Sequence, residues 1–570
     1  MEKREKKEYI RKSGIYIWLV KNKRLLCCAF VWGVPFACSC VLGWRLVSKG
    51  TVFGPGGSFA AGMGSFLLFL LQTALLSVPV AALAAVIMRG GKSKRVGRTA
   101  AEDLQGRRPA WQMWLFYGAV IFLCWVPVFL AYYPSVFAYD AEGQLYQVIS
   151  HDYSTHHPLL HTLFLGAFFR LGGALGSYSA GMAVHSVVQM VLMAAAFGWA
   201  LSYLYRRQIP RWIRILLLLF YGFFPANSVL ALSTTKDVLF SALVLTFTLW
   251  MYRMVCDRGM RGGRKEQAVW IALAVLMLLF RNNAVYAFAV SVPVVYLGIG
   301  KPARRTYLRM ALLALLLFAA GSATLKTATH AHSGSPREML SVPLQQMART
   351  RVEAEEQLSP QMRQELENYI PSEWVFAAYH PHLADPVKNR AVIHDNPKGL
   401  IVTWMKLGLQ HPAVYMDAFL DNSLGLWFLW DTSHAQVYGI GTESGFGYLS
   451  TDNRTMPAGC EIVEHSFLPG LRVFMEKIVS DNEYGKLPVV RLLFAPALYW
   501  WLLYLYLVAA LYQKKYREML PAVYLAAYYL TLLLSPTVLV RYMYPIMVTI
   551  PVILPCLMMN TQRDGCENIQ

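Results

Sequence analysis

The sequence predicts an all-α polytopic membrane protein with about 12 transmembrane helices. Hydrophobic residues make up 56% of the chain, and the mean hydropathy is +0.38. About half is usual for a soluble chain, whose apolar runs are also short. Here many segments exceed the roughly 18 apolar residues that indicate a spanning helix. Spans are expected near 24–46, 65–88, 111–133, 178–204, 213–231, 237–255, 267–281, 284–300, 307–326, 489–511, 518–535 and 541–559.

The basic residues indicate topology and not a nucleic-acid partner. The chain has 53 Lys and Arg against 33 Asp and Glu, a formal charge of +20, but no contiguous basic domain. The charges gather in the N-terminal tail and in short loops between spans: 89–108, 206–214, 257–265, 301–305 and 513–517. Because basic loops stay in the cytoplasm, we expect a multi-pass plasma-membrane protein with both termini cytoplasmic.

Two ambiguous segments are decided by this bias. The stretch 158–172 is short and carries His161 and Arg170, and a span there would move the loop 206–214 outside, so we expect an interfacial helix. The stretch 267–300 would be roughly 50 Å long as one helix, against a hydrocarbon core of about 30 Å. Two short spans, with the triplet 281–283 in an external turn, keep its arginine out of hydrocarbon.

Four parts follow from this topology. One of them is an insertion between the spans, residues 327–488, which is expected to be extracytoplasmic and mainly helical. Its clearest helical stretch is 351–370. The parts are an N-terminal tail with two extra spans (1–110), a transmembrane core (111–326) with a first extracytoplasmic loop (134–177), the soluble insertion (327–488), and the C-terminal spans and tail (489–570).

The polar residues at span ends collect on the extracytoplasmic face. Charges there are costly unless they are paired or hydrated, so several on one surface indicate a site. The candidates are Asp140, Glu142, Gln144, His156 and His157 in the first loop, Lys236 and Asp237 after span five, Arg281, Asn282 and Asn283, and Arg541, Tyr542 and Tyr544 at the last span.

Each candidate also has a simpler interpretation. A single loop carboxylate is commonly just solvated, and Lys236 could snorkel to the interface. Arg281 and Arg541 could anchor span ends, although external arginines oppose the usual charge bias. The first-loop histidines do not have the spacing of a zinc site, so no metal ligand is assigned.

A glycosyl transfer at the bilayer surface would use this set of groups. A sugar on a lipid phosphate needs cations such as Lys236, Arg281 or Arg541 to neutralise its leaving group. The acceptor hydroxyl needs a general base, for which Asp140 is the candidate, with Glu142 beside it. The insertion could then cover the site and recognise the acceptor.

The motif YPSVFAYDAEGQ followed by HHPLLHTL resembles the first extracytoplasmic loop of GT-C superfamily glycosyltransferases. These include protein O-mannosyltransferases and lipid A aminoarabinose transferases. The resemblance implies a GT-C-like core, Asp140 as the base, and a juxtamembrane helix starting at His157-Pro158-Leu159. It also implies a polyprenyl-phosphate sugar donor, inverting transfer and, in some members, a divalent cation. TTKD, RNN and RYxxP look like a subgroup of uncharacterised bacterial membrane proteins with this layout.

The match has two departures, and other classes stay open. The acidic motif is Asp-Ala-Glu, where the family has an adjacent pair or Asp-x-Asp, and the two spans within 24–88 have no counterpart. The expected function is transfer of a sugar to an envelope glycan, lipid or protein. The alternatives are a transporter or flippase of lipid-linked saccharides, and a scaffold whose insertion binds partner proteins.

Overall fold

The chain is an all-α membrane protein. The computed structural model describes residues 21–52, 59–90, 108–257, 262–393, 398–430, 457, 459–479 and 487–558. Within them the regular structure is helical, and β-pairing is limited to isolated bridges. Seven of these helices are long and apolar enough to cross a membrane, and the bent pair α8–α9 is an eighth candidate. The full set of twelve spans remains a prediction, and both chain termini lie outside the described residues.

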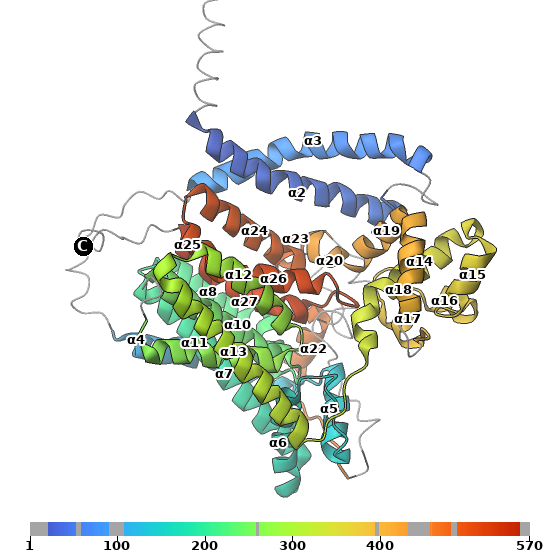
Figure 1. Ribbon diagram of the computed structural model, residues 1–570. Helices are drawn as coiled ribbons and strands as arrows, with labels where there is room; N and C mark the ends of the chain where they lie inside the picture. Colours follow the sequence, from blue (N-terminus) through green and yellow to red (C-terminus); the bar gives the residue numbers. More distant parts are fainter. Residues whose placement is uncertain are drawn as a thin grey trace, which may run out of the picture.

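The helices before the insertion form a hairpin and most of the bundle (Figure 1). The hairpin consists of α2 (Lys23–Lys49) and α3 (Phe59–Gly90). The bundle helices are α4 (Ala110–Ala131), α5 (Tyr139–Ser150), α6 (Leu159–Ala174), α7 (Tyr178–Arg206), α8 (Arg211–Phe223), α9 (Pro225–Leu232), α10 (Asp237–Tyr252) with a π-helical end at Arg253–Asp257, α11 (Arg264–Phe280), α12 (Ala284–Gly298) and α13 (Lys301–Ala328).

The insertion and the C-terminal part complete the chain. The insertion contains α14 (Ser341–Ala354), α15 (Pro360–Glu367), α16 (Ser372–Ala378), α17 (Asp385–Arg390), α18 (Lys398–Gln410), α19 (Pro412–Asn422), α20 (Leu424–Trp427), α22 (Pro469–Val479), and 3-10 turns at Pro336–Leu340 and Glu355–Gln357. The last helices are α23 (Pro488–Phe494), α24 (Pro496–Tyr512), α25 (Tyr516–Met519), α26 (Val523–Leu532) and α27 (Val540–Met558), with a 3-10 turn at Leu520–Ala522.

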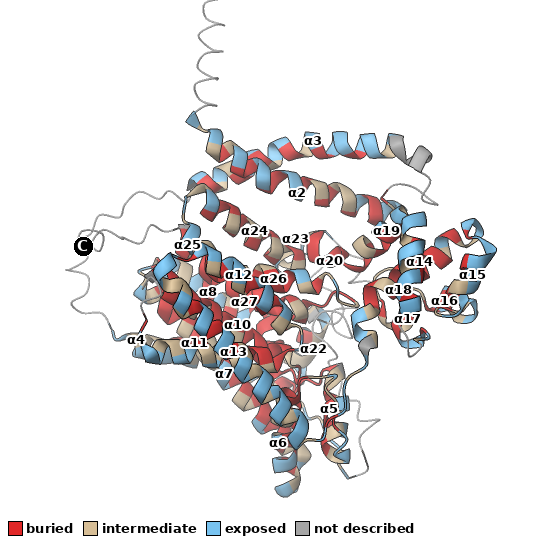
Figure 2. Cartoon of the chain, viewed as in Figure 1, coloured by how far each residue is buried: buried red, intermediate tan, exposed pale blue. Residues whose placement is uncertain are grey.

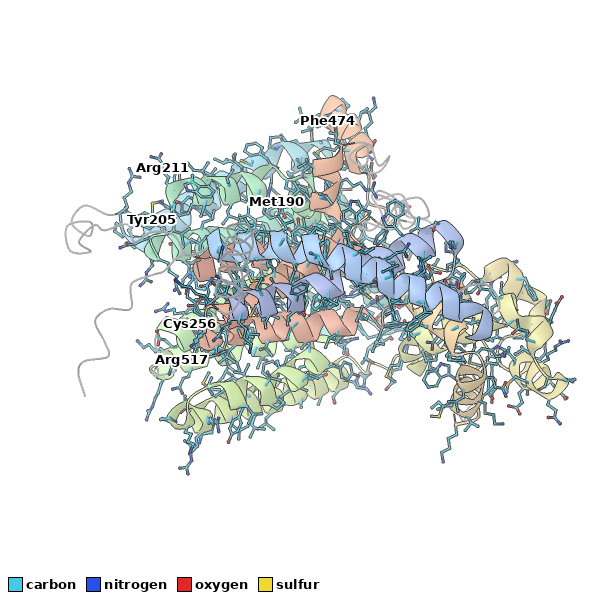
Figure 3. The ribbon with its side chains drawn as sticks, turned by 90° about the horizontal axis from the view of Figure 1, so that it is seen from above. Met190, Tyr205, Arg211, Cys256, Phe474 and Arg517 are labelled. Atoms are coloured by element: carbon cyan, nitrogen blue, oxygen red, sulfur yellow. The ribbon has the colours of Figure 1, made fainter. Side chains whose placement is uncertain are left out.

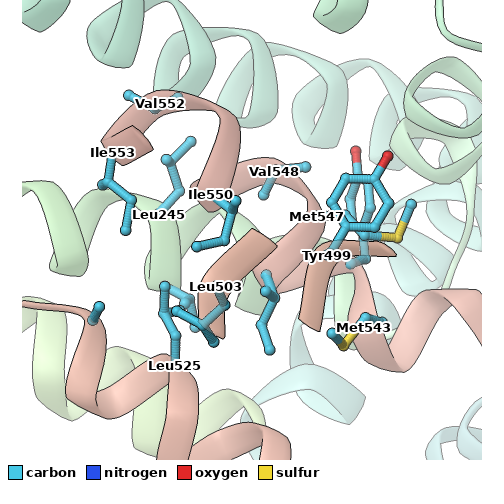
Figure 4. Close-up of a cluster of buried hydrophobic side chains, with 14 of the residues drawn as sticks. Leu245, Tyr499, Leu503, Leu525, Met543, Met547, Val548, Ile550, Val552 and Ile553 are labelled. Atoms are coloured by element: carbon cyan, nitrogen blue, oxygen red, sulfur yellow. The ribbon is translucent and has the colours of Figure 1, made fainter. Parts of the chain in front are cut away.

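The centre of the bundle is formed by α10 and α27. In each of these two helices, 78% of the residues in the most apolar segment are buried. The buried share is 22% in α3 and in α4, and 17% in α13. Figure 4 shows α27 side chains such as Met547 and Ile550 packed near Leu245 of α10 and Leu503 of α24. The outer helices keep apolar exposed faces, which are pale blue along α3 and α13 in Figure 2. Those faces suit contact with lipid.

The described residues of the basic loops lie at one end of the bundle. Arg24 Nη2 donates to the Tyr516 hydroxyl at 3.2 Å, and Cys256 Sγ lies 3.5 Å from the Arg517 carbonyl. Figure 3 shows Arg211, Cys256 and Arg517 at this end, opposite the yellow helices of the insertion. We call it the basic end and the opposite one the insertion end. The grouping agrees with the expectation that these loops share one side.

The two ambiguous segments have the expected helix boundaries. The stretch 158–172 lies in α6, which begins directly after Pro158, and the stretch 267–300 breaks between α11 and α12 at Arg281–Asn283. The expected helical stretch 351–370 is not one helix. It is interrupted after Gln357, and α15 starts with Ser359 as N-cap and Pro360 in its first turn. Proline fits the first turn of a helix and breaks its interior, so a new helix begins there.

Candidate functional site

A short stretch of main-chain pairing brings the starts of α5 and α10 together. The Val136 amide donates to the Leu232 carbonyl at 3.1 Å, and the Thr234 amide donates to the Val136 carbonyl at 2.9 Å. Asp140 and Lys236 follow these segments by a few residues and open the two helices. The pairing therefore sets the register in which their side chains meet, although 96 residues separate them.

Two buried polar side chains of α7 hold this pairing in place. Gln189 Nε2 donates to the carbonyls of Ala231 and Ser233 at 3.0 and 2.7 Å, and Ser186 Oγ donates to the Pro134 carbonyl at 2.9 Å. Irregular backbone inside a membrane bundle needs such partners, because an unsatisfied buried carbonyl is costly. The start of both site helices is thus built into the core.

Five charged side chains from four segments form an ion cluster. Lys236 Nζ donates to Asp140 Oδ2 at 2.6 Å, and Arg541 Nη1 lies 3.6 Å from the same oxygen. Arg541 Nε lies 3.8 Å from Asp237 Oδ2, and Arg281 forms an ion pair with Asp237. Arg541 therefore links the two carboxylates, and three cations against two carboxylates leave one positive charge in surplus.

The cluster has a closed part and a rim. The Asp237 side chain is 0% exposed, and Arg281 and Arg541 are 8% and 5% exposed. By contrast, Asp140 and Lys236 are 18% and 15% exposed. The inner pairs are structural in character, since a buried charge is stable only with its partner. The rim pair is the part of the cluster that a ligand can reach.

Thr235 and Tyr542 complete the surroundings of the arginines. Thr235 Oγ1 accepts from Arg541 Nη1 at 3.2 Å and donates to Asp237 Oδ2 at 3.0 Å. The Tyr542 ring centroid lies 4.9 Å from the Arg281 guanidinium and 5.3 Å from that of Arg541. A ring between two guanidinium groups stabilises both through cation–π contact. Thr235 belongs to the TTKD motif but was not among the candidate residues.

The Arg-Asn-Asn turn acts as a scaffold. Arg281 Nε donates to Asn283 Oδ1 at 2.9 Å, and Asn283 Nδ2 donates to Thr531 Oγ1 at 3.1 Å. Asn282 Nδ2 donates to the carbonyl of His156 at 3.1 Å. The turn therefore joins α26 and the loop before α6 to the inner part of the cluster.

The rim charges shift the pKa values of their neighbours. Burial alone would raise the pKa of Asp140, but Lys236 and Arg541 hold it well below its usual range. Burial and Lys236 lower the pKa of His157 to about 3, so this ring is neutral at physiological pH. His157 Nδ1 lies 3.3 Å from Lys236 Nζ and accepts from the ammonium, which puts the ring proton on Nε2. The His156 and His157 ring centroids are 4.5 Å apart.

The three remaining candidate residues lie on α5 and α27. Glu142 is two positions after Asp140 on α5, and residues so spaced on a helix do not face each other. Gln144 is buried and donates to Thr162 Oγ1 at 2.8 Å, which ties α5 to α6. The Tyr544 hydroxyl donates to Asn227 Oδ1 at 2.9 Å. Gln144 thus joins α5 to α6, and Tyr544 joins α27 to α9.

The insertion contributes one residue that the sequence did not indicate. The Ala384 amide donates to the Pro536 carbonyl at 2.8 Å, at the turn that leads into α27. The next residue, Asp385, is close enough to act electrostatically on Arg541 and Tyr542. Nothing in the spacing of these segments could have indicated that meeting, because tertiary docking creates it.

The carboxylates do not fit a divalent cation. Asp140 and Asp237 are both engaged by lysine or arginine, and a cation site needs carboxylate oxygens free to coordinate. Over the described ranges, no group of three or more His, Cys, Asp and Glu side chains is arranged to hold a metal ion.

These features define an all-α membrane protein with a charged cluster at the insertion end of its bundle. Residues 150–569 match the model of DUF6020, a family of unknown function, and the chain belongs to this family. The matched region includes Lys236, Asp237, Arg281 and Arg541, whereas Asp140 precedes it. No curated protein and no solved structure matches the chain.

Proposed function

We propose that the chain is a membrane glycosyltransferase that moves a sugar from a polyprenyl-phosphate donor to a cell-envelope glycan, lipid or protein. The observation that carries this proposal is the Asp140 carboxylate at the exposed rim of a cation-rich cluster, 2.6 Å from Lys236 and 3.6 Å from Arg541. Cations bind the leaving phosphate, and a carboxylate serves as base. The insertion end is then extracytoplasmic, because the basic loops gather at the opposite end.

The ion pairs of Asp140 with Lys236 and Arg541 represent the resting state of the site, before a donor binds. With its pKa held low by Lys236 and Arg541, Asp140 is a weak base. A donor phosphate competes for both cations and is favoured by the surplus positive charge of the cluster. As the cations turn to the phosphate, the pKa of Asp140 rises and its oxygen becomes available to a hydroxyl. Donor binding thus activates the base.

The transfer step follows from this arrangement. The acceptor hydroxyl oxygen attacks the anomeric carbon of the sugar, and its proton passes to Asp140. The bond between that carbon and the phosphate oxygen breaks, and the polyprenyl phosphate leaves with the electron pair. Attack opposite the leaving group inverts the anomeric configuration. Lys236 and Arg541 stabilise the charge that develops on the phosphate.

The test is Asp140→Asn with two readouts. In cells that lack the wild-type chain, we expect transfer to the envelope to fall by about 10²–10⁴-fold, the usual contribution of a general base. Mass spectrometry of envelope extracts measures the product. Polyprenyl phosphate binding to the purified variant in nanodiscs is expected to be retained or tighter, since a carboxylate no longer competes for the cations.

Glu142→Gln is the matched control, because it changes a nearby carboxylate on another side of α5. It is expected to keep transfer. Full transfer by Asp140→Asn would exclude Asp140 as the base. A wild-type chain that moves lipid-linked saccharides across vesicle membranes without transferring sugar would assign it to the transporters instead.

A further inference from the structure

Helix α18 of the insertion has an apolar face with no protein packed over it in the described part of the chain. Ile401, Val402, Met405 and Leu409 are 38%, 50%, 53% and 85% exposed. Their spacing places them along one side of the helix. Leu400, Thr403 and Leu407, on the opposite side, are buried in the insertion. A surface helix normally exposes polar side chains and buries its apolar ones. An exposed apolar face therefore indicates an interaction site.

The charges on this helix are basic only. Lys398 and Lys406 are exposed, and α18 contains no Asp or Glu. Lys406 Nζ lies 3.3 Å from Glu365 Oε1 but is still 51% exposed. An apolar stripe flanked by lysines is typical of a helix that lies in the interface of a membrane. Lysine stems reach along apolar surface while their ammonium groups contact headgroups.

The next helix joins this face to the membrane-exposed hairpin. In α19, Asp417 Oδ2 accepts from Thr51 Oγ1 at 2.6 Å, and Oδ1 accepts from the Val52 amide at 3.0 Å. Those residues follow the end of α2, whose Trp44 is 60% exposed. Met416, beside Asp417, is 48% exposed. Exposed apolar side chains thus lie on the hairpin, at Trp44, and on both α18 and α19.

We infer that the exposed face of α18 rests on the membrane leaflet at the insertion end. The occupant of this face is lipid, because the neighbouring hairpin also exposes apolar side chains and the charged residues of α18 itself are lysines. Lying on the leaflet, α18 supports the insertion beside the rim of the bundle. The inference is independent of the reaction proposed above.

The experiment places a photoreactive residue on this face in the full chain. Leu409 is replaced by p-benzoylphenylalanine, and the protein is reconstituted in nanodiscs of phosphatidylglycerol and phosphatidylcholine. After illumination, mass spectrometry measures covalent lipid adducts. Gln357 is the matched control, since it is exposed on the same insertion but lies in a 3-10 turn and not in α18. Both positions are solvent-accessible, so neither change should disturb folding.

We expect lipid adducts at position 409 in at least tenfold excess over position 357. A chain-to-chain adduct at 409 would assign the face to a second copy and overturn the inference. Equal yields at the two positions, or no lipid adduct at 409, would overturn it too. The same measurement at Met405, one turn earlier, is expected to give lipid adducts as well.

Discussion

Asp140 and Asp237 carry the same carboxylate in two environments, and their roles differ for that reason. Asp237 is fully buried between Arg281 and Arg541, where removing one partner leaves charge without compensation. Asp140 sits at the rim and retains contact with solvent. The first is therefore expected to stabilise the bundle, and the second to serve the reaction.

Asp237→Asn is expected to lower the free energy of unfolding by about 3–5 kcal/mol, the usual effect of breaking a buried ion pair. Asp140→Asn should lower it by only about 1 kcal/mol, as for a partly exposed pair. Thermal unfolding in detergent compares the two. If both variants lost the same free energy of unfolding, the inner ion pairs would not be more important for stability than the rim pair.

The pKa of Asp140 gives a second prediction at this scale. Lys236→Met removes the nearest cation, so burial raises the pKa of Asp140 against the remaining pull of Arg541. A carboxylate base works above its pKa, and the acid limb of the pH–transfer profile should therefore move to higher pH. The pH of half-maximal transfer is the readout, because loss of a phosphate contact also lowers the rate at every pH.

Lys236→Arg is the control for that shift, since it keeps a cation beside Asp140. Its acid limb should stay close to that of the wild type. The ion pair between Asp140 and Lys236 also makes the stability of the fold depend on pH. Because its folded pKa is depressed, Asp140 stabilises the fold above the unfolded value of about 3.9, and this is lost as the pH falls through the folded pKa.

At the scale of helices, local signals were enough to locate boundaries. Pro158 marks the start of α6, the charged triplet 281–283 marks a break between α11 and α12, and the acidic end of TTKD opens α10. Each depends on a short-range cost, either a missing amide proton or a charge in hydrocarbon. Ser359-Pro360 is such a signal too, and it divides the stretch 351–370, which was expected to be the clearest helical part of the insertion.

The pairing of the site residues could be predicted only in part. That Asp140, Lys236 and Arg541 share one face follows from topology, because all precede or follow spans on the same side. Arg281 forms its ion pair with Asp237 and not with the rim residue Asp140. This choice depends on how α11 and α27 pack against α10. The approach of Asp385 depends on docking of the insertion, for which no periodicity gives a signal.

At the scale of the whole molecule, two of the contacts that attach the insertion connect it to the C-terminal spans and to the N-terminal hairpin. One is at the turn before α27, through Ala384 and Pro536, and the other is at the turn after α2, through Asp417. The helix α2 ends at Lys49, and its C-cap Gly50 has a φ of 70°, the left-handed conformation that glycine adopts readily. Arg349 Nη2 donates to the Gly50 carbonyl. The hairpin, which the sequence left without a role, thus helps to hold the insertion at one end of the bundle.

Asp417→Ala should loosen the contact between the insertion and the hairpin while leaving the bundle folded. Asp417 is 2% exposed and accepts two hydrogen bonds, and the loss of such bonds to a charged group costs about 1.5–3 kcal/mol each. Hydrogen exchange should become faster at Thr51 and Val52 and throughout α14 and α19, but not in α10 or α27. Asp152→Ala is the control, since Asp152 is 76% exposed in a surface pair with His332 and should change little. Faster exchange confined to Thr51 and Val52 would mean that the hairpin binds the insertion without holding it in place.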